Sequence, residues 1–378
     1  MGYICELGAV SEEPMGDEAK TAVLLLAHGT PDTIDEIPDY LKNVVSGRPM
    51  PQHVVEEIQH RYAQIGSSPL TRLTLEQAAL LQAAAGLPVY VGMRNWKPYI
   101  VDTVRQMRAD GVKSAVAICL APQNSRTSVG LYRRAAFAEA GSGEDALMID
   151  FIEGWAEHPL LADAFAERLR PVWAEACAEA GEKVPVLFTA HSVPCRTIQT
   201  PQTTPTPGPG AAQENPPDGD AAVATTSGAG TPCGSATAPV RPTSAERSYA
   251  LPKAAAQGPD PYPVEAKTTA AMVAGRMKGL EEWYFAFQSQ GASGGPWIGP
   301  SVEDTMRALK ASGRGGVVLQ PIGFLCDHVE ILYDIDIAFQ QLARELGLKL
   351  WRPESLNASP LLTAALADLV RSSTSKPR

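Results

Sequence analysis

Short, mainly apolar segments recur along the chain and alternate with amphipathic stretches. The apolar segments predict β-strands at 22–27, 89–93, 115–120, 147–152, 186–190, 283–287, 317–321 and 349–351. The amphipathic stretches predict helices at 51–65, 73–85, 100–109, 160–178, 264–278 and 302–311. Strands that are apolar on both faces and separated by helices indicate an α/β fold, with parallel sheets covered by helices on both faces.

Two of the predicted strands end in similar sequences. The first ends as LLLAHGTP, which contains His28, and a later one ends as LFTAHSVP, which contains His191. Both read strand, Ala, His, small residue, any residue, Pro. We therefore expect two similar α/β lobes that present these histidines to a shared cleft, because ligands bind at the carboxyl ends of parallel strands.

The composition narrows the class of protein. A chain of 378 residues with 44% hydrophobic residues is long enough for two domains, and its formal charge of −10 argues against a nucleic-acid partner. None of the six cysteines forms a CxxC pair, so we expect no zinc or iron–sulfur cage and a reducing, cytoplasmic location. No apolar run is long enough to span a membrane, which leaves peripheral membrane contact open.

Two segments differ from the rest of the chain. Residues 1–20 are polar and acidic, without the features of a signal peptide, and are predicted to be a disordered N-terminus. Residues 197–259 hold eleven of the 32 prolines and no periodic apolar face, which predicts a disordered insertion. The expected units are an N-terminal lobe at 21–160, a C-terminal lobe at 161–354 that carries the insertion, and a C-terminal helix and tail at 355–378.

His191 is a candidate for chemistry near neutral pH. At the end of a buried strand it can face a cleft as a base or metal ligand, and it can equally be a strand-end histidine bonded to the backbone. The neighbouring Ser192 does not suit a hydrolase, because A-H-S-V-P lacks the glycines of a G-x-S-x-G nucleophile elbow.

The segment PIGFLCDHVEILYDIDIA at 321–338 is rich in metal-binding side chains. A helix is expected to begin near Asp327, with Asp327 as N-cap and Glu330 as its capping-box partner. Glu330 and Asp334 are four residues apart and share one helix face, where two like charges are unfavourable unless a cation or proton lies between them. With His328 nearby, this donor set suits a loosely held divalent ion such as Fe(II).

Three loops carry further candidates. Trp297, in FQSQGASGGPWIGP, can form an apolar wall for a flat ligand or simply anchor its loop. The segment RYAQIGSSPL carries Arg61, Tyr62 and Ser68, which can bind carboxylates or be solvated loop residues. Arg126, in the loop APQNSRTS, can likewise bind a carboxylate or be a solvated loop residue.

With these motifs the sequence resembles the ferrochelatases. The matching pieces follow the family's order over nearly all of residues 20–370, apart from the insertion. AHS-x-P together with G-F-x-x-[DE]-H-x-E-x-L-Y is highly specific. The pieces are LLLAHGTP, RYAQIGSSPL, VYVGMRNWKPYI, LAPQNSRTSVG, FTAHSVP, DPYP, FQSQ…PWIGP, PIGFLCDHVEILYDID and RPESLNASP.

The resemblance implies two similar Rossmann-like lobes with four-stranded parallel sheets and a porphyrin cleft between them. It implies insertion of Fe(II) into a free-base porphyrin in haem biosynthesis, with release of two pyrrole protons. His191 and Glu330 match the family's invariant histidine and glutamate, which act as proton acceptors and metal ligands, and Asp334 extends the acidic line. Iron and porphyrin are then substrates, and no cofactor or iron–sulfur cluster is expected.

Several positions depart from the family pattern. His28 stands where relatives carry tyrosine or methionine facing the metal, so it is a candidate axial ligand to iron. Ala338 and Asn124 replace an acidic residue and a tyrosine. The run SGRPMP…RYAQIGSSPL resembles the monoderm bacterial type, which uses coproporphyrin III, but protoporphyrin IX stays open. The alternatives are a chelatase for another tetrapyrrole, such as sirohydrochlorin with cobalt, and a non-catalytic haem-binding carrier.

Overall fold

The computed structural model describes residues 20–143, 145–198, 259–290 and 295–375. The first sheet has the order β2-β1-β3-β4, and the second has the order β6-β5-β7-β8. Every strand pair is parallel. The strands are β1 (Thr21–Ala27), β2 (Val89–Met93), β3 (Ser114–Cys119), β4 (Met148–Ile152), β5 (Val186–His191), β6 (Trp283–Gln288), β7 (Gly316–Pro321) and β8 (Lys349–Trp351).

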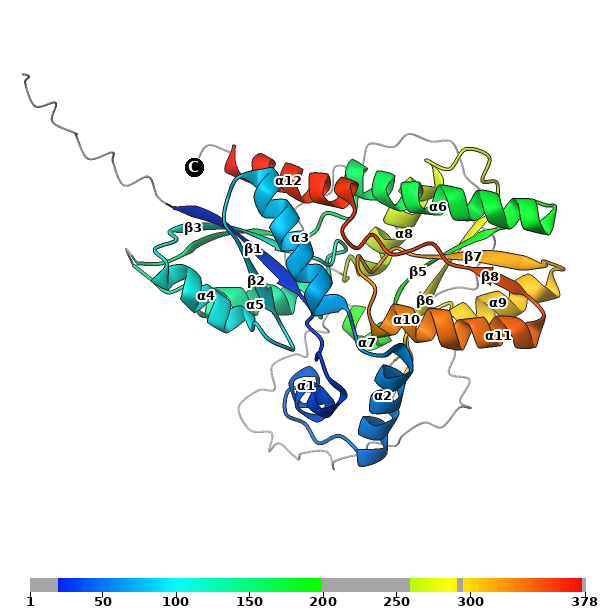
Figure 1. Ribbon diagram of the computed structural model, residues 1–378, viewed down its shortest axis with the longest axis horizontal. Coiled ribbons are helices and arrows are strands. Elements are labelled where there is room, and N and C mark those ends of the chain that lie inside the picture. The colour runs from blue at the N-terminus through cyan, green and yellow to red at the C-terminus, as the bar shows by residue number, and fades with distance from the viewer. Residues whose placement is uncertain (1–19, 144, 199–258, 291–294, 376–378) are drawn as a thin grey trace, which may run out of the picture.

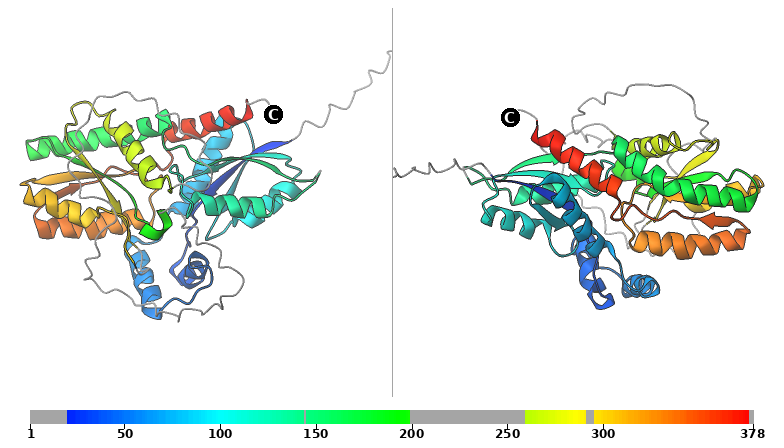
Figure 2. Two further views of the ribbon diagram at one scale, coloured as in Figure 1. Left: turned by 180° about the vertical axis from the view of Figure 1, so that it is seen from behind. Right: turned by 45° about the horizontal axis from the view of Figure 1, so that its top comes forward.

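The two sheets have the same topology, which confirms the prediction of two similar α/β lobes. In each, the first strand along the chain lies second in the sheet, so β1 and β5 occupy equivalent places. The sheets lie side by side, with helices on both faces, while α1 and α2 project from one side of the molecule (Figures 1 and 2). His28 directly follows β1 and His191 ends β5, so the repeated Ala-His motif reflects this equivalence.

Amphipathic helices cover the apolar strands. Those at 100–109 and 302–311 have the predicted limits, whereas α1, α5, α7 and α11 were not predicted. The helices are α1 (Ile37–Val44), α2 (Gln52–Ile65), α3 (Leu70–Ala85), α4 (Ile100–Ala109), α5 (Val129–Ala138), α6 (Pro159–Ala180), α7 (Cys195–Ile198), α8 (Tyr262–Ala274), α9 (Val302–Ala311), α10 (Val329–Leu332), α11 (Gln340–Leu346) and α12 (Pro360–Thr374).

The largest hydrophobic core joins the two lobes. It contains side chains of both sheets and of α3, α6, α8 and α12. Helix α12 follows all the other described elements, yet it packs against α3 of the first lobe and α6 of the second (Figure 1). Its buried Leu362, Leu366 and Val370 therefore connect the lobes on the side away from α1 and α2.

The helix expected from Asp327 begins later than predicted. Helix α10 starts at Val329, with His328 at its N-cap position, and a π-helical segment, Asp334–Phe339, follows it. The N-cap prediction for Asp327 is wrong, because its carboxylate accepts hydrogen bonds from Ser355 and Asn357 instead of helix N–H groups.

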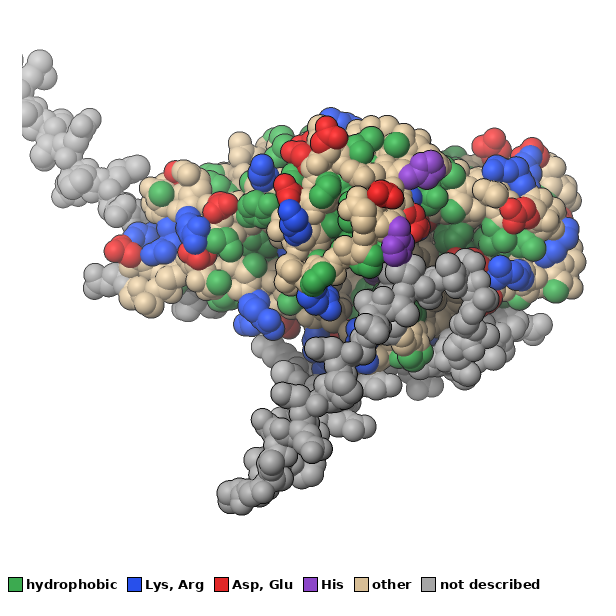
Figure 3. Space-filling view, turned by 90° about the horizontal axis from the view of Figure 1, so that it is seen from below, with side chains coloured by type: hydrophobic (Ala, Val, Ile, Leu, Met, Phe, Trp, Pro, Cys, Tyr) green, Lys and Arg blue, Asp and Glu red, His purple; other side chains and the backbone are tan. Residues whose placement is uncertain are grey.

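The predicted disordered N-terminus and insertion fall almost entirely outside the described residues. In the described ranges, no helix is long and apolar enough to cross a membrane. On the visible face in Figure 3, Lys and Arg side chains are interspersed with Asp and Glu rather than gathered into a stripe.

Candidate active site

A cavity of about 340 Å³ lies where the two sheets direct the carboxyl ends of their strands. Its walls come from segments that follow β1, β3, β5 and β7, and from the loop that carries Trp297. Both lobes therefore contribute to it, as expected for ligand sites in α/β sheets. Its titratable and charged lining residues are His28, Tyr40, Arg94, Tyr132, His191, Tyr262, Cys326, His328 and Glu330.

His191 is held at the end of β5 by its backbone. Its carbonyl accepts a hydrogen bond from the Tyr262 hydroxyl at 2.8 Å. The next residue, Ser192, is buried and donates its hydroxyl to the Ile298 carbonyl at 2.9 Å, so this hydroxyl is not available as a nucleophile. The fixed backbone leaves the His191 imidazole facing the cavity, with Nδ1 3.1 Å from Oε2 of Glu330.

His191 and Glu330 interact electrostatically at the cavity wall. Burial acts to lower the pKa of His191, but Glu330 and then Asp334 outweigh it, and the pKa is raised above 6.5. Burial likewise acts to raise the pKa of Glu330, but His191, followed by His328 and His28, outweighs it and lowers the pKa to about 2. The carboxylate is therefore ionised near neutral pH, and the imidazole is made more basic.

His28 enters the same cavity from the first lobe. It immediately precedes the tight turn at Gly29, where φ is +77° and a Cβ would lie 2.8 Å from Cβ of Met93, so only glycine fits without strain. Nε2 of His28 lies 3.0 Å from the Tyr40 hydroxyl, and the Asn95 amide nitrogen lies 3.1 Å from Nε2 and 3.3 Å from Nδ1. Burial lowers the pKa of His28 to about 4, so the ring is neutral near pH 7.

Asp334 lies behind Glu330 rather than in the cavity lining. Its Oδ2 accepts a hydrogen bond from the hydroxyl of Ser289, a residue in the left-handed conformation with φ 61°. Its Oδ1 lies 3.9 Å from Arg61. Burial, followed by the charge of Glu330, raises the pKa of Asp334 to about 6, which is suited to exchanging a proton near neutral pH.

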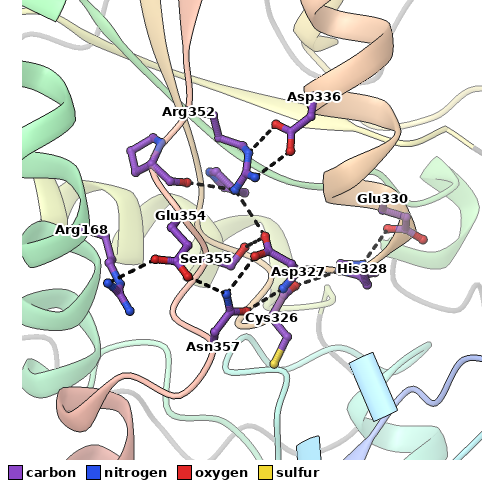
Figure 4. A network of polar contacts seen from close by, with 12 residues as sticks. Arg168, Cys326, Asp327, His328, Glu330, Asp336, Arg352, Glu354, Ser355 and Asn357 are labelled. Carbon is purple, nitrogen blue, oxygen red and sulfur yellow. Dashed lines mark hydrogen bonds and ion pairs between the residues drawn. The ribbon is translucent and has the colours of Figure 1, made fainter. Parts of the chain in front are cut away.

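A polar network fixes the loop that leads into His328 and Glu330 (Figure 4). Asp327 accepts hydrogen bonds from Ser355 at 2.7 Å, from Asn357 at 2.8 Å and from Arg352 at 3.3 Å. Arg352 also binds both oxygens of Asp336, a residue of the π-helical segment. The network thus ties the segments on both sides of α10 to the chain that follows β8.

Replacing Arg352 with methionine is expected to lower the free energy of unfolding by about 3 kcal/mol, because it leaves Asp327 and Asp336 without their shared cation in a largely buried place. Denaturant titration measures this change. Arg307→Met is the matched control, since Arg307 pairs with Asp304 on the exposed face of α9 and its loss should be negligible. Equal changes in the two variants would contradict the role given to Arg352.

Three of the residues predicted to bind porphyrin do not line the cavity. Tyr62 is buried in the cluster formed by α1, α2 and Trp96. Ser68 is buried and accepts a hydrogen bond from Thr30, which does line the cavity. Arg61 lies over the ring of Tyr333, at 5.1 Å from its centroid.

Trp297 does line the cavity, and its loop pairs with Pro194 shortly after His191. Arg94 was not singled out from the sequence, although it lies in the matched piece VYVGMRNWKPYI. Among the described residues, it is the one Lys or Arg in the cavity lining. One signal could have identified it: Arg94 immediately follows a predicted strand, and that strand lies beside the strand that ends before His28.

Two metal-ligating groups in the cavity suit a metal ion that enters as a substrate. His191 supplies an imidazole nitrogen and Glu330 a carboxylate oxygen, side by side on one wall. In the part of the chain that the structure describes, no group of three or more His, Cys, Asp or Glu side chains is arranged to hold a metal ion.

Comparison with known proteins places residues 20–374 within the ferrochelatase family model. A ferrochelatase of Acidobacterium capsulatum is 60% identical over 94% of this chain and 95% of its own. A coproporphyrin III ferrochelatase of Geobacillus sp. is 31% identical over 93% of this chain and 97% of its own. The solved structure of SirB from Bacillus subtilis with Fe3+ covers 94% of this chain and 96% of its own, with 11% identity and a TM-score of 0.48.

Proposed function

The chain belongs to the ferrochelatase family and inserts ferrous iron into a porphyrin in haem biosynthesis, and from this premise we propose that His191 and Glu330 perform the insertion. The observation that carries the proposal is the contact of 3.1 Å between Nδ1 of His191 and Oε2 of Glu330 on the cavity wall. The pair combines a proton acceptor and an anionic donor for the incoming cation.

The proton balance assigns a role to each group. The free porphyrin carries two pyrrole N–H groups, and Fe²⁺ replaces both protons, so two protons leave for each iron inserted. Neutral His191 accepts one pyrrole proton and releases it before it accepts the second, while ionised Glu330 attracts the incoming Fe²⁺. Asp334, with its pKa near 6, lies four residues further along the chain and can accept protons that leave the site. In this proposal no resident cofactor takes part.

The cavity also suits the rim of a porphyrin. Apolar side chains such as Leu70, Phe324 and Trp297 can cover the flat ring, and Arg94 can bind a propionate. Coproporphyrin III and protoporphyrin IX both carry propionates, so this chemistry fits either. One of the relatives is a coproporphyrin III ferrochelatase, which makes that porphyrin the first to test.

The proposal is tested by mixing the purified protein, after treatment with a chelator, anaerobically with Fe(II) and each porphyrin while following the Soret band. Insertion into one porphyrin and not the other identifies the substrate. Sirohydrochlorin with cobalt is a parallel arm. Haem binding without any insertion would instead indicate a carrier, and would contradict the proposal.

Replacing Arg94 with leucine is expected to raise KM for the porphyrin about tenfold, with kcat changed little, because a charge-assisted hydrogen bond to the propionate is lost. Steady-state kinetics at saturating Fe(II) measures both constants. Arg72→Leu, at an exposed position of α3, should leave both unchanged. A lower kcat with unchanged KM would contradict propionate binding by Arg94.

We further propose that His28 is an axial ligand to iron in the product. Its neutral ring lies in the cavity, but both nitrogens have polar neighbours, so ligation requires one nitrogen to exchange its partner for iron. His28→Ala is expected to weaken haem binding about tenfold, which corresponds to ~1.4 kcal/mol. Tyr40→Phe removes one of the two polar neighbours of Nε2 and should not weaken binding. Titration with haem compares the variants, and equal weakening in both would contradict ligation.

A further inference from the structure

A buried glutamine joins the two partners of the His191–Glu330 pair. Gln288 ends β6, and the register of the sheet places it directly beside His191 on β5. Its side chain is 1% exposed, and it does not line the cavity. Gln288 therefore does not contact the porphyrin or the iron directly, and can affect them only through its neighbours.

Three hydrogen-bonding groups of Gln288 bond to the chain segments that carry His191 and Glu330. Its Oε1 accepts a hydrogen bond from the Thr189 hydroxyl at 2.6 Å, and its backbone carbonyl accepts one from the Ser192 N–H at 2.7 Å. Its Nε2 donates to the backbone carbonyl of Glu330 at 3.0 Å. One residue thus binds the chain on both sides of His191 and the chain at Glu330.

Glu330 needs such a support more than His191 does. His191 lies at the end of the strand β5, which pairs with neighbours on both sides, whereas Glu330 belongs to α10, a helix of four residues. The network around Asp327 fixes the loop before α10, but it makes no bond to the backbone of Glu330 (Figure 4). Gln288 provides the direct bond between the backbone of Glu330 and the sheet that carries His191.

We infer that Gln288 is a positioning residue for iron insertion, which sets the separation between His191 and Glu330. The inference rests on the proposed function of that pair. Its physical basis is that a displacement of about 1 Å in reacting groups can cost a factor of about 100 in rate. Because Gln288 does not line the cavity, its loss should change the turnover step and leave porphyrin binding intact.

The test compares Gln288→Leu with Gln320→Leu. Gln320 is a matched control, because it is a fully buried glutamine on β7, the strand on the other side of β5, and its Nε2 donates to the Pro321 carbonyl rather than to the site. Thr189→Val is a milder variant that removes only the hydrogen bond to Oε1 of Gln288 and preserves side-chain volume. Thermal unfolding followed by circular dichroism confirms that each variant is folded before kinetics are measured.

Gln288→Leu is expected to lower kcat for iron insertion at least about tenfold, with KM for the porphyrin within about twofold of the original. Thr189→Val should lower kcat about threefold, and Gln320→Leu should leave it unchanged. In a protein that already carries Glu330→Gln, adding Gln288→Leu should lower kcat by less than about twofold, because both changes act through Glu330.

Three outcomes would overturn the inference. The first is an unchanged kcat in folded Gln288→Leu or, if that variant does not fold, in Thr189→Val. The second is an equal loss of kcat in Gln320→Leu. The third is full additivity of the losses of kcat caused by Gln288→Leu and Glu330→Gln. Any of these, together with an inactive His191→Ala variant, leaves the proposed function standing. Normal turnover in His191→Ala would overturn the proposed function itself.

Discussion

Replacing His191 with alanine is expected to lower kcat for iron insertion by a factor of about 100 or more, since general-base catalysis typically contributes at least that much. The variant loses both the proton acceptor and one of the two donors beside the incoming iron. The fold should survive, because His191 is held through its backbone and its imidazole faces the cavity.

The measurement is the initial rate of the Soret change under anaerobic conditions with saturating Fe(II) and porphyrin. His60→Ala is a suitable control, because His60 is exposed on α2, away from the cavity lining. A His191→Ala protein that binds porphyrin normally but turns over at near the original rate would mean that another group accepts the pyrrole protons.

Replacing Glu330 with glutamine is expected to have an effect of similar size, about 100-fold on kcat, because the amide neither carries charge for Fe²⁺ nor accepts a proton near neutral pH. The change should also alter the pH dependence. In the original protein Glu330 raises the pKa of His191, so the neutral base is lost as the pH falls through a value above 6.5. Without Glu330, burial prevails and lowers this pKa, so the acidic limb of kcat should move to lower pH.

The pH profile of kcat for Glu330→Gln, compared with that of the original protein, measures this shift. Glu345→Gln provides the control, as Glu345 is exposed on α11 and should change neither the rate nor the limb. A limb that stays in place, or moves to higher pH, would show that Glu330 does not set the basicity of His191.

The sheets were readily predicted from the sequence. The strands at 89–93 and 349–351 were predicted to the residue, because short runs dominated by apolar residues are typical of strands in parallel sheets. The repeated Ala-His motif correctly indicated equivalent strands in two lobes, since each lobe has to present its chemistry at the same edge of its sheet.

The local structure around the site could not be predicted in the same way. Asp327 has the spacing of an N-cap, yet Arg352, Ser355 and Asn357 compete for its carboxylate, and these residues lie about one helix-and-strand unit further along the chain. The π-helical segment after Tyr333 likewise shifts the helical period that the sequence pattern assumes.

Contacts between distant segments account for the other differences between the predicted and the observed site. Arg61 and Tyr62 read as ligand-binding residues by their type, but α2 directs them toward Tyr333 and the cluster of Trp96. Gln288 was part of a recognised motif, and its three bonds became visible only once β5, β6 and α10 were placed side by side. The sequence motifs therefore drew attention to His191 and Glu330, which the structure brings into contact, while the residues around them depended on the tertiary structure.

The packing of α12 has a consequence for biosynthesis. During translation the first lobe emerges early, yet the surfaces of α3 and α6 that α12 covers stay uncovered until the ribosome has made this later helix. Nascent chains of this protein thus expose the apolar side of their shared core for most of their synthesis, and chaperones that bind apolar segments have their main opportunity in that interval. A premature stop codon before Pro360 would make this exposure permanent and direct the product to proteolysis.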